Sequence, residues 1–398
     1  MNILKRNLLF VLSLALVFSC GGNSNSEGTK EQVSNYKLEI VDSVQVDALA
    51  QYMIIADVHK KTGELLAIQS SPPKLWILSP QGEIKSVWEK QGDGPDEIGQ
   101  YLLSAEFYGN DIAMMGMMRL KVFNRDFELV KDMKPHYNQG GMIYMGFNHL
   151  IEFGTQGAEQ LVTFFGGPQT DIPALNKEYY DEYNIVDVVN PNSELSLGEG
   201  TKSGFLPIGK LESDSRYKNN RAYYFMKPEF DVKESKLFYA LKDDTTVFVR
   251  SLPQGELERS YTIPFDEFIL FEGYSLGKEG IAEQNEPRDW AGKIEKIFHV
   301  DDKELLIYTS GIKLSKVQEL DPESSDFREK TKRVNYTKHL IINDGKRLNL
   351  DLRLPEKVSS FDMADDFGFI WAHQDLSLLE EEPDLITFYK LKIVPDEN

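Results

Sequence analysis

Short apolar runs alternate with tight turns along most of the chain from about Tyr36 onward, and helical periodicity is scarce. The run Leu75–Leu78 is followed by the turn residues Ser79–Gly82 and by the more polar run Glu83–Trp88. The same succession recurs at 120–130, 247–259 and 340–348. Each of these units has the pattern of a strand, a tight turn and a second, more polar strand. The pattern therefore predicts an all-β fold built from antiparallel hairpins.

The spacing of these turns indicates how the hairpins are organised. Gly82, Phe127, Gly255 and Gly345 occupy equivalent places and are 45, 128 and 90 residues apart. Forty-five residues is the length of one four-stranded propeller blade, 90 corresponds to two, and 128 to three short blades or to two with an insertion. Because a blade buries its faces only against its neighbours, such an array must close into a ring. We predict a β-propeller of six blades, with seven as the alternative; two unrelated β-sandwiches would give hairpins but no common period.

The two ends of the repetitive region are expected to close the ring. Residues 37–44 and 385–394 both alternate as strands, so they can pair within one blade and leave no free sheet edge. The expected propeller domain spans residues 37–396, with insertions near 155–220 and 278–300. The first is rich in Gly, Asn, Asp and Ser, whereas the second places Trp290, Ile294, Ile297 and Phe298 on one face of a predicted short helix.

The N-terminus has the pattern of an export signal. Lys5 and Arg6 precede the eleven-residue run Leu8–Phe18, which is too short to span a bilayer and is interrupted only by Ser13. Val17-Phe18-Ser19-Cys20 resembles the lipobox of bacterial lipoproteins, which implies that residues 1–19 are removed and Cys20 is acylated. Residues 20–36 then form a polar, flexible tether. We expect an exported protein that is lipid-anchored in the cell envelope, in the outer membrane.

Composition excludes several classes of function. The 398 residues include 44 Lys and Arg against 64 Asp and Glu, a formal charge of −20. Nucleic acid is therefore not expected as a partner, because affinity for it depends on cationic neutralisation of phosphates. A single Cys excludes disulfides within the chain and multi-thiolate metal sites.

One loop carries a resemblance to a known family. Gly92-Asp93-Gly94-Pro95-Asp96-Glu97 resembles the G-x-G-P-x-E signature of the six-bladed β-propeller lipoproteins of Bacteroidota, which are similar in shape to TolB-like and NHL propellers. Gly92, Gly94, Pro95 and Glu97 match it residue by residue, and the resemblance implies that they connect one blade to the next. We interpret these residues as structural, because glycine allows positive φ, proline fixes a turn, and Glu97 is placed to accept bonds from backbone amides of the loop.

The most enzyme-like motif is Gly273-Tyr274-Ser275-Leu276-Gly277, which resembles the nucleophile elbow of α/β-hydrolases. His299, His339 and His373 follow it, so a triad order can be drawn. However, the residues after Ser275 are charged and soon reach Pro287, no oxyanion segment precedes them, and the upstream chain lacks βαβ alternation. A serine hydrolase using Ser275 is therefore the weakest alternative, and no catalytic residue is assigned.

The sequence contains only weak patterns for metal or glycan binding. The six histidines, at 59, 136, 149, 299, 339 and 373, form no H-E-x-x-H motif, and no metal or other cofactor is expected. The acidic pairs at 243–244, 301–302 and 365–366 are predicted to lie in hairpin turns. Glu178–Tyr183 places aromatics beside carboxylates, as in a carbohydrate site or an exposed amphipathic loop.

The predicted function is a lipid-anchored propeller that binds a partner protein or a glycan. The alternative is an enzyme that uses the propeller face, as a glycan lyase or hydrolase.

Overall fold

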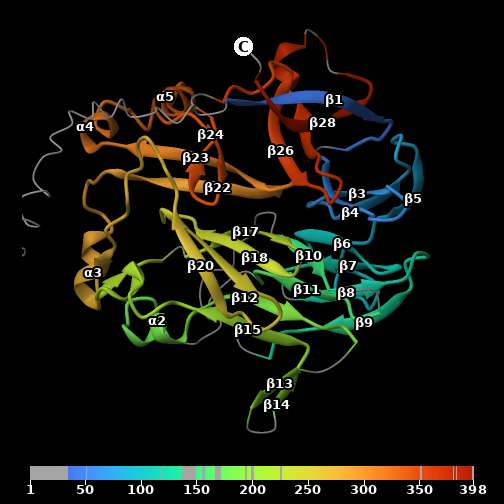
Figure 1. The fold of residues 1–398 in the computed structure, drawn as a ribbon, viewed down its shortest axis with the longest axis horizontal. Coiled ribbons are helices and arrows are strands. Elements are labelled where there is room, and N and C mark those ends of the chain that lie inside the picture. The colour runs from blue at the N-terminus through green and yellow to red at the C-terminus, as the bar shows by residue number, and fades with distance from the viewer. Residues whose placement is uncertain are drawn as a thin grey trace, which may run out of the picture. The chain divides into compact units, whose positions relative to one another are not determined.

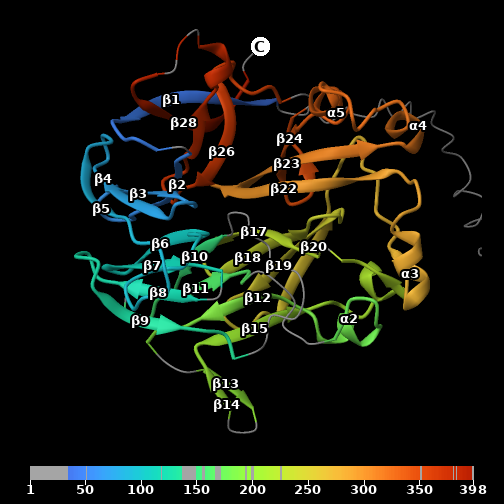
Figure 2. The same ribbon diagram turned by 180° about the vertical axis from the view of Figure 1, so that it is seen from behind.

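The computed structural model describes residues 35–50, 52–117, 119–136, 149–154, 157–165, 172–192, 195–198, 201–224, 226–349, 352–379, 381 and 383–396. Its strands form six four-stranded antiparallel sheets, arranged around a centre as the blades of a propeller (Figure 1; Figure 2). The all-β, six-bladed prediction is confirmed. The predicted signal (1–19) and Cys20 lie outside the described residues.

The blades follow one another along the chain, and each begins with its innermost strand. Blades 1 and 2 contain β2 (Ile54–Val58), β3 (Leu65–Gln69), β4 (Lys74–Leu78) and β5 (Ile84–Trp88), then β6 (Ser104–Tyr108), β7 (Asp111–Met115), β8 (Leu120–Phe123) and β9 (Leu129–Met133). Blades 3 and 4 contain β10 (Leu150–Phe153), β11 (Gln160–Thr163), β12 (Asn184–Val189) and β15 (Phe205–Lys210), then β17 (Pro228–Lys233), β18 (Lys236–Leu241), β19 (Thr246–Ser251) and β20 (Leu257–Thr262). Blade 5 contains β22 (Trp290–Val300), β23 (Lys303–Ile312), β24 (Lys338–Asn343) and β25 (Lys346–Arg347).

Blade 6 closes the ring with both ends of the repetitive region. It contains β26 (Val358–Ala364), β27 (Ile370–Gln374), β28 (Ile386–Pro395) and, outermost, β1 (Tyr36–Val46). The pairing of β1 with β28 is antiparallel and runs from Tyr36 opposite Pro395 to Val46 opposite Ile386. The predicted closure is confirmed. The first strand of each blade also contacts the first strand of both neighbouring blades, so these six inner strands surround the centre of the ring.

The four turns used to infer the repeat are structurally equivalent. Gly82, Phe127, Gly255 and Gly345 each lie between the third and fourth strands of a blade, and each has a positive φ, between 61° and 92°. The 128-residue spacing runs from blade 2 to blade 4. This confirms the interpretation of two blades with an insertion and excludes three short blades. The 90-residue spacing was misread as two blades: Gly255 and Gly345 belong to adjacent blades 4 and 5. Long connections before β22 and between β23 and β24 account for the extra length.

The prediction of a helix carrying Trp290, Ile294, Ile297 and Phe298 is wrong, because these residues form β22, the inner strand of blade 5. Ile294 and Ile297 are both fully buried although they are three positions apart, whereas a regular strand turns every second side chain to the same face. The pairing register with β23 shifts between Ile294 and Lys296, and such a bulge moves the following side chains to the opposite face of the strand. The bulge therefore produces the three-residue spacing that was interpreted as helical.

The connections contain the remaining elements. Residues 155–220, expected to be an insertion, hold three strands of blade 3 together with the added elements α2 and the β13–β14 hairpin. The elements outside the blades are α2 (Glu178–Glu182), β13 (Leu195–Gly198), β14 (Thr201–Ser203), η1 (Arg216–Lys218), β16 (Arg221–Ala222), β21 (Tyr274–Ser275), α3 (Lys278–Glu283), α4 (Leu314–Val317), α5 (Phe327–Val334) and η2 (Leu376–Leu378). Over the described ranges, none of the helices combines the length and apolar character required to cross a bilayer.

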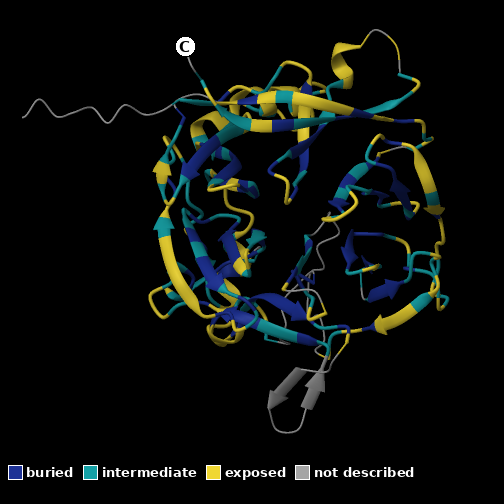
Figure 3. Ribbon diagram, turned by 45° about the vertical axis from the view of Figure 1, so that its right-hand side comes forward, coloured by how far each residue is buried: buried dark blue, intermediate teal, exposed yellow. Residues whose placement is uncertain are grey.

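Burial decreases from the middle of each blade to its outer strand (Figure 3). Strands β3 and β6 are buried at every position, whereas β5, β9 and β20 are mostly exposed. Blade faces pack directly on each other; Ile68 and Leu75 of blade 1, for example, belong to the same apolar cluster as Phe107 and Met114 of blade 2. This packing explains the near-continuous apolar runs of the central strands, since both of their faces are covered.

Candidate functional site

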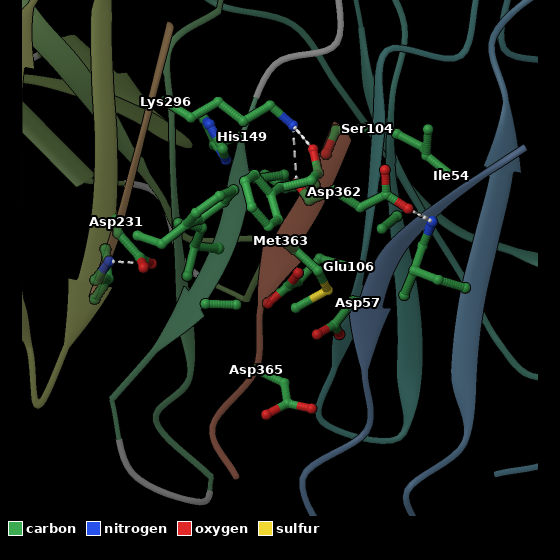
Figure 4. A pocket seen from close by; sticks show the side chains of 18 of the residues that line it. Ile54, Asp57, Ser104, Glu106, His149, Asp231, Lys296, Asp362, Met363 and Asp365 are labelled. Carbon is green, nitrogen blue, oxygen red and sulfur yellow. Dashed lines mark hydrogen bonds between the residues drawn. The ribbon is translucent and has the colours of Figure 1, made fainter. Parts of the chain in front are cut away.

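A cavity of about 410 Å³ lies at the centre of the ring (Figure 4). Residues of the inner strands of all six blades line it. Its wall is strongly charged, with nine carboxylates, five lysines and two histidines: Asp57, Glu106, Glu152, Glu229, Asp231, Glu295, Asp362, Asp365, Asp366, Lys60, Lys227, Lys233, Lys242, Lys296, His149 and His299. A concave site with convergent polar groups is the strongest candidate for ligand binding in this fold.

Several of these carboxylates are fixed by the neighbouring blade. Asp57 of β2 accepts the backbone N–H of Phe107 on β6 at 2.8 Å, and Glu106 of β6 accepts that of Glu152 on β10 at 2.8 Å. We call such a bond, from a backbone N–H of one inner strand to a carboxylate of the preceding blade, an inter-blade clamp. The clamp satisfies an edge N–H that has no partner within its own sheet.

Two further clamps complete the set that the described residues contain. Asp231 of β17 accepts the N–H of His299 on β22 at 2.7 Å, and Asp362 of β26 accepts the N–H of Ile55 on β2 at 2.9 Å. At the junction of blades 5 and 6 the polarity is reversed, because the Lys296 ammonium donates to the carbonyls of Phe361 and Asp362. Burial lowers the pKa of Lys296. The inner wall is thus a set of charged groups that bond to backbone atoms of the next blade.

One end of the cavity, at the start of the inner strands, holds a mixed cluster that we call the lysine end: His149, Lys227, Glu229, Lys242, Glu295 and Lys296. Glu229 lies 3.4 Å from the Lys227 ammonium and 3.7 Å from His149 Nε2, and Lys242 lies 3.3 Å from Glu295. Burial alone would raise the pKa of Glu229, but His149, Lys227 and Lys242 outweigh it and lower the pKa. Both carboxylates at this end therefore have cationic partners.

The opposite end holds an excess of carboxylates, and we call it the acid end: Asp57, Lys60, Glu106, Glu152, Asp231, Lys233, Asp365 and Asp366. Lys60 lies 3.3 Å from Glu152 and 3.4 Å from Asp366. Burial raises the pKa of Asp57 to about 7, and burial together with the nearby Asp57 raises that of Glu106. Burial would lower the pKa of Lys60, but Asp366, Glu106 and Glu152 raise it overall. Near neutral pH this end binds protons that an unfolded chain would release.

The raised pKa values predict how stability depends on pH. A carboxyl with a raised pKa in the native state stabilises the fold below its unfolded pKa, and this contribution is lost as pH rises toward the folded pKa. For Asp57 the loss falls between about pH 4 and pH 7. The variant Glu106→Gln should match the wild type near pH 4 and be more stable at pH 8, by on the order of 1 kcal/mol.

Denaturant unfolding of both proteins across this pH range measures the effect. Glu258→Gln, on the exposed outer strand β20, serves as the control and should follow the wild-type profile. A Glu106→Gln variant that loses stability in parallel with the wild type as pH rises would show that Glu106 does not titrate as described.

The G-x-G-P-x-E residues lie in the connection between β5 and β6, away from the cavity lining. The N–H of Gly94 donates to Glu97, and a Cβ added at Gly92 would lie only 2.3 Å from the same carboxylate. Lys121, whose side chain is fully buried, donates to the carbonyls of Gly94 at 3.0 Å and Pro95 at 2.8 Å. The geometry of this loop is that of a turn held by its own side chains.

Ser275 belongs to the short strand β21, which pairs with β16 outside the blades. Its hydroxyl donates to Glu283, and it accepts a bond from Arg221 at 3.3 Å; neither partner is a histidine. The histidines proposed for a triad lie in blades 5 and 6, where His299 lines the cavity and His373 lies 2.8 Å from Asp362. His339 is partly buried in β24, and desolvation lowers its pKa to about 4. The structure does not bring these residues together with Ser275.

The segment 178–183 is neither an open carbohydrate platform nor an exposed loop. Residues 178–182 form the helix α2, and Tyr179, Tyr180 and Tyr183 are all buried in the core. The three acidic pairs do lie between hairpin strands, as predicted. Asp365 accepts the N–H groups of Phe367 and Phe369 and the Trp371 indole N–H, so it stabilises its own turn.

Sequence reasoning missed Asp57, Glu106, Asp231, Asp362 and Lys296. The sequence does contain a pattern that could have identified three of them. A single acidic residue interrupts a short apolar segment at the start of a blade in residues 54–58, 230–232 and 361–363. A buried charge at such a position requires a partner, and in a propeller the neighbouring blade is the nearest source.

Comparison with solved structures agrees with the fold. A DUF4221-family protein of Bacteroides vulgatus ATCC 8482 is similar with a TM-score of 0.57 and 14% identity, covering 92% of this chain and 100% of that chain. A protein described as exported, from Bacteroides fragilis NCTC 9343, is similar with a TM-score of 0.52 and 11% identity, covering 90% and 96%. No family model and no curated protein matches this sequence. The likeness to these two Bacteroides proteins therefore concerns the fold alone.

Proposed function

We propose that this chain is an exported, lipid-anchored propeller of the cell envelope that binds the end of a glycan in its central cavity. The observation that carries the proposal is the convergence of charged and polar side chains from six blades on one cavity of about 410 Å³. The export signal predicted for residues 1–19 and the lipobox-like position of Cys20 support the location. A cavity of this size accommodates one or two sugar rings, whereas a folded partner protein would need an extended surface.

The chemistry of the wall supports a hydroxyl-rich ligand. Lysine ammonium groups donate hydrogen bonds and carboxylates accept them, so both ends of the cavity can bond to sugar hydroxyls. Tyr52 lies at the rim with 52% of its surface exposed, and its ring stacks on His373 with the centroids 5.4 Å apart. An aromatic ring in this position offers an apolar face to a sugar. The clamp carboxylates already accept backbone N–H groups, which favours a binding role over a catalytic one.

Isothermal titration calorimetry of the full chain in detergent against a panel of mono- and disaccharides tests this function. We expect at least one sugar to bind, and Lys242→Ala at the lysine end should weaken its affinity about tenfold, equivalent to ~1.4 kcal/mol. The control is Lys236→Ala, whose lysine pairs with Glu258 on the outside of the same blade and should leave affinity unchanged. Absence of binding by every sugar would refute the proposal, and capture of a protein partner equally by both variants would favour a protein-binding face.

A further inference from the structure

The charge of the cavity wall is unequal between its two ends. The lysine end has Lys227, Lys242 and Lys296 facing Glu229 and Glu295, with His149 beside them; Asp362 of β26, which lies 2.8 Å from His373, adjoins this end. The acid end has six carboxylates and two lysines, with His299 as its further titratable group. Carboxylates therefore outnumber cationic groups at the acid end but not at the lysine end.

The two lysines at the acid end form their close ion pairs with Glu152 and Asp366, and Lys60 acts on Asp57 and Glu106 only from beyond 4.0 Å. Lys60 is 3.3 Å from Glu152 and 3.4 Å from Asp366, and Lys233 approaches Asp366 at 4.0 Å. Within the described ranges, neither Asp57 nor Glu106 has an ammonium or guanidinium group within 4.0 Å. Leaving a buried carboxylate without a paired cation costs several kcal/mol.

Glu106 carries the free bonding capacity. Only 6% of the surface of Glu106 is exposed, and its Oε1 accepts the backbone N–H of Glu152. Its Oε2 accepts no hydrogen bond from any described residue, and Figure 4 shows the side chain directed into the cavity next to Asp57 and Met363. A buried acceptor that points into an accessible cavity is available to a donor on a ligand.

The neighbouring groups favour an organic cation over a metal ion. Both oxygens of Asp57 are occupied by backbone N–H groups, from Val58 at 2.6 Å and Phe107 at 2.8 Å. Calcium requires six to eight oxygen ligands, and the described residues contain no group of three or more acidic, His or Cys side chains arranged to hold a metal. A primary ammonium has three donors and is satisfied by fewer, more widely spaced acceptors.

We infer that the ligand carries a protonated primary amine, which binds Glu106 at the acid end while the rest of the ligand extends toward the lysine end. This inference rests on the proposed glycan-binding function, and the ligand class that combines both is an amino sugar with a free ammonium group. The raised pKa values of Asp57 and Glu106 agree with it, because a bound cation would restore their ionised forms.

Calorimetric titration of the full chain at pH 7 with glucosamine, N-acetylglucosamine and ethanolamine tests the inference. Glucosamine should bind at least tenfold more tightly than N-acetylglucosamine, whose nitrogen is uncharged. Binding should release protons, which titrations in buffers of different ionisation enthalpy measure. Glu106→Gln should abolish both the preference and the proton release, and Glu258→Gln should retain them.

The outcomes separate this inference from the proposed function. Equal binding of the two sugars, or unchanged preference in Glu106→Gln, would overturn the amine inference and leave glycan binding intact. Binding of ethanolamine alone, lost in Glu106→Gln, would support the amine site and refute the glycan function. No binding by either amine would overturn the inference even if Glu106→Gln failed to fold, because this comparison uses the wild-type chain.

Discussion

A chain that begins at Asp47, and so lacks β1, is expected to lose the cooperative unfolding transition of the complete propeller. Strand β1 pairs with β28 from Tyr36 to Val46 and buries Leu38, Val44 and Val46. Each of these three side chains contributes about 1.5–3 kcal/mol by burial. Their combined loss is comparable with the whole stability of a typical domain, about 5–15 kcal/mol. The removal also exposes the edge of β28 to aggregation.

Thermal unfolding followed by circular dichroism, together with size-exclusion chromatography, measures this effect. A chain that begins at Asn35 is the matched control and should unfold cooperatively, since it retains all of β1. Addition of a peptide of residues 35–47 to the shortened chain should restore part of the transition. If the chain from Asp47 were monomeric and as stable as the control, β1 would not be required for ring closure.

Asp362→Ala is expected to destabilise the fold by about 3–5 kcal/mol, the cost of removing one partner from a buried charged network. The Asp362 carboxylate accepts the N–H of Ile55 from blade 1 and lies 2.8 Å from His373 Nε2. The nearly buried Lys296 ammonium, at the junction of blades 5 and 6, donates to the Asp362 carbonyl, and the Asp362 charge opposes the effect of burial on its pKa. The alanine variant would leave the Ile55 N–H without an acceptor. It would also remove the negative charge that stabilises the Lys296 ammonium. Asp362→Asn should cost less, because its amide oxygen can still accept from Ile55.

Equilibrium unfolding in urea at pH 7 provides the measurement. Asp42→Ala is the control: its carboxylate is exposed on β1 and lies 3.4 Å from Lys390, so its loss should change stability by about 0.5 kcal/mol or less. A cost below about 1 kcal/mol for Asp362→Ala would mean that the inter-blade clamp does not hold blades 6 and 1 together.

The parts of the fold that were predictable depend on local signals. Turn residues such as Gly82 and Phe127 adopt a left-handed backbone within their own hairpin, so their spacing could reveal the blade repeat. The closure by β1 and β28 followed from alternation at both ends of the repetitive region. In contrast, the bulge between Ile294 and Lys296 changes the period within one strand, and the sequence pattern alone imitated a helix.

The candidate site was not predictable because its contacts are distant in sequence. Asp57 is 50 residues from Phe107, Asp231 is 68 from His299, and Asp362 is 307 from Ile55. No window of sequence contains both partners of any of these bonds. Single acidic residues in apolar strands were visible, but their common orientation toward one cavity depends on the closed ring.

The position of β1 also determines when the protein can finish folding. Tyr36 pairs with Pro395, almost the whole chain away. The outer strand β1 of blade 6 therefore cannot form its hydrogen bonds until β28 is available. Such non-local pairing is slow, because the entropy of closing the loop is lost before any contact is gained. A chain that emerges from a membrane with its N-terminus first therefore cannot complete the ring until its last strand has crossed. For the exported chain that we propose, the topology itself therefore places completion of the fold after translocation.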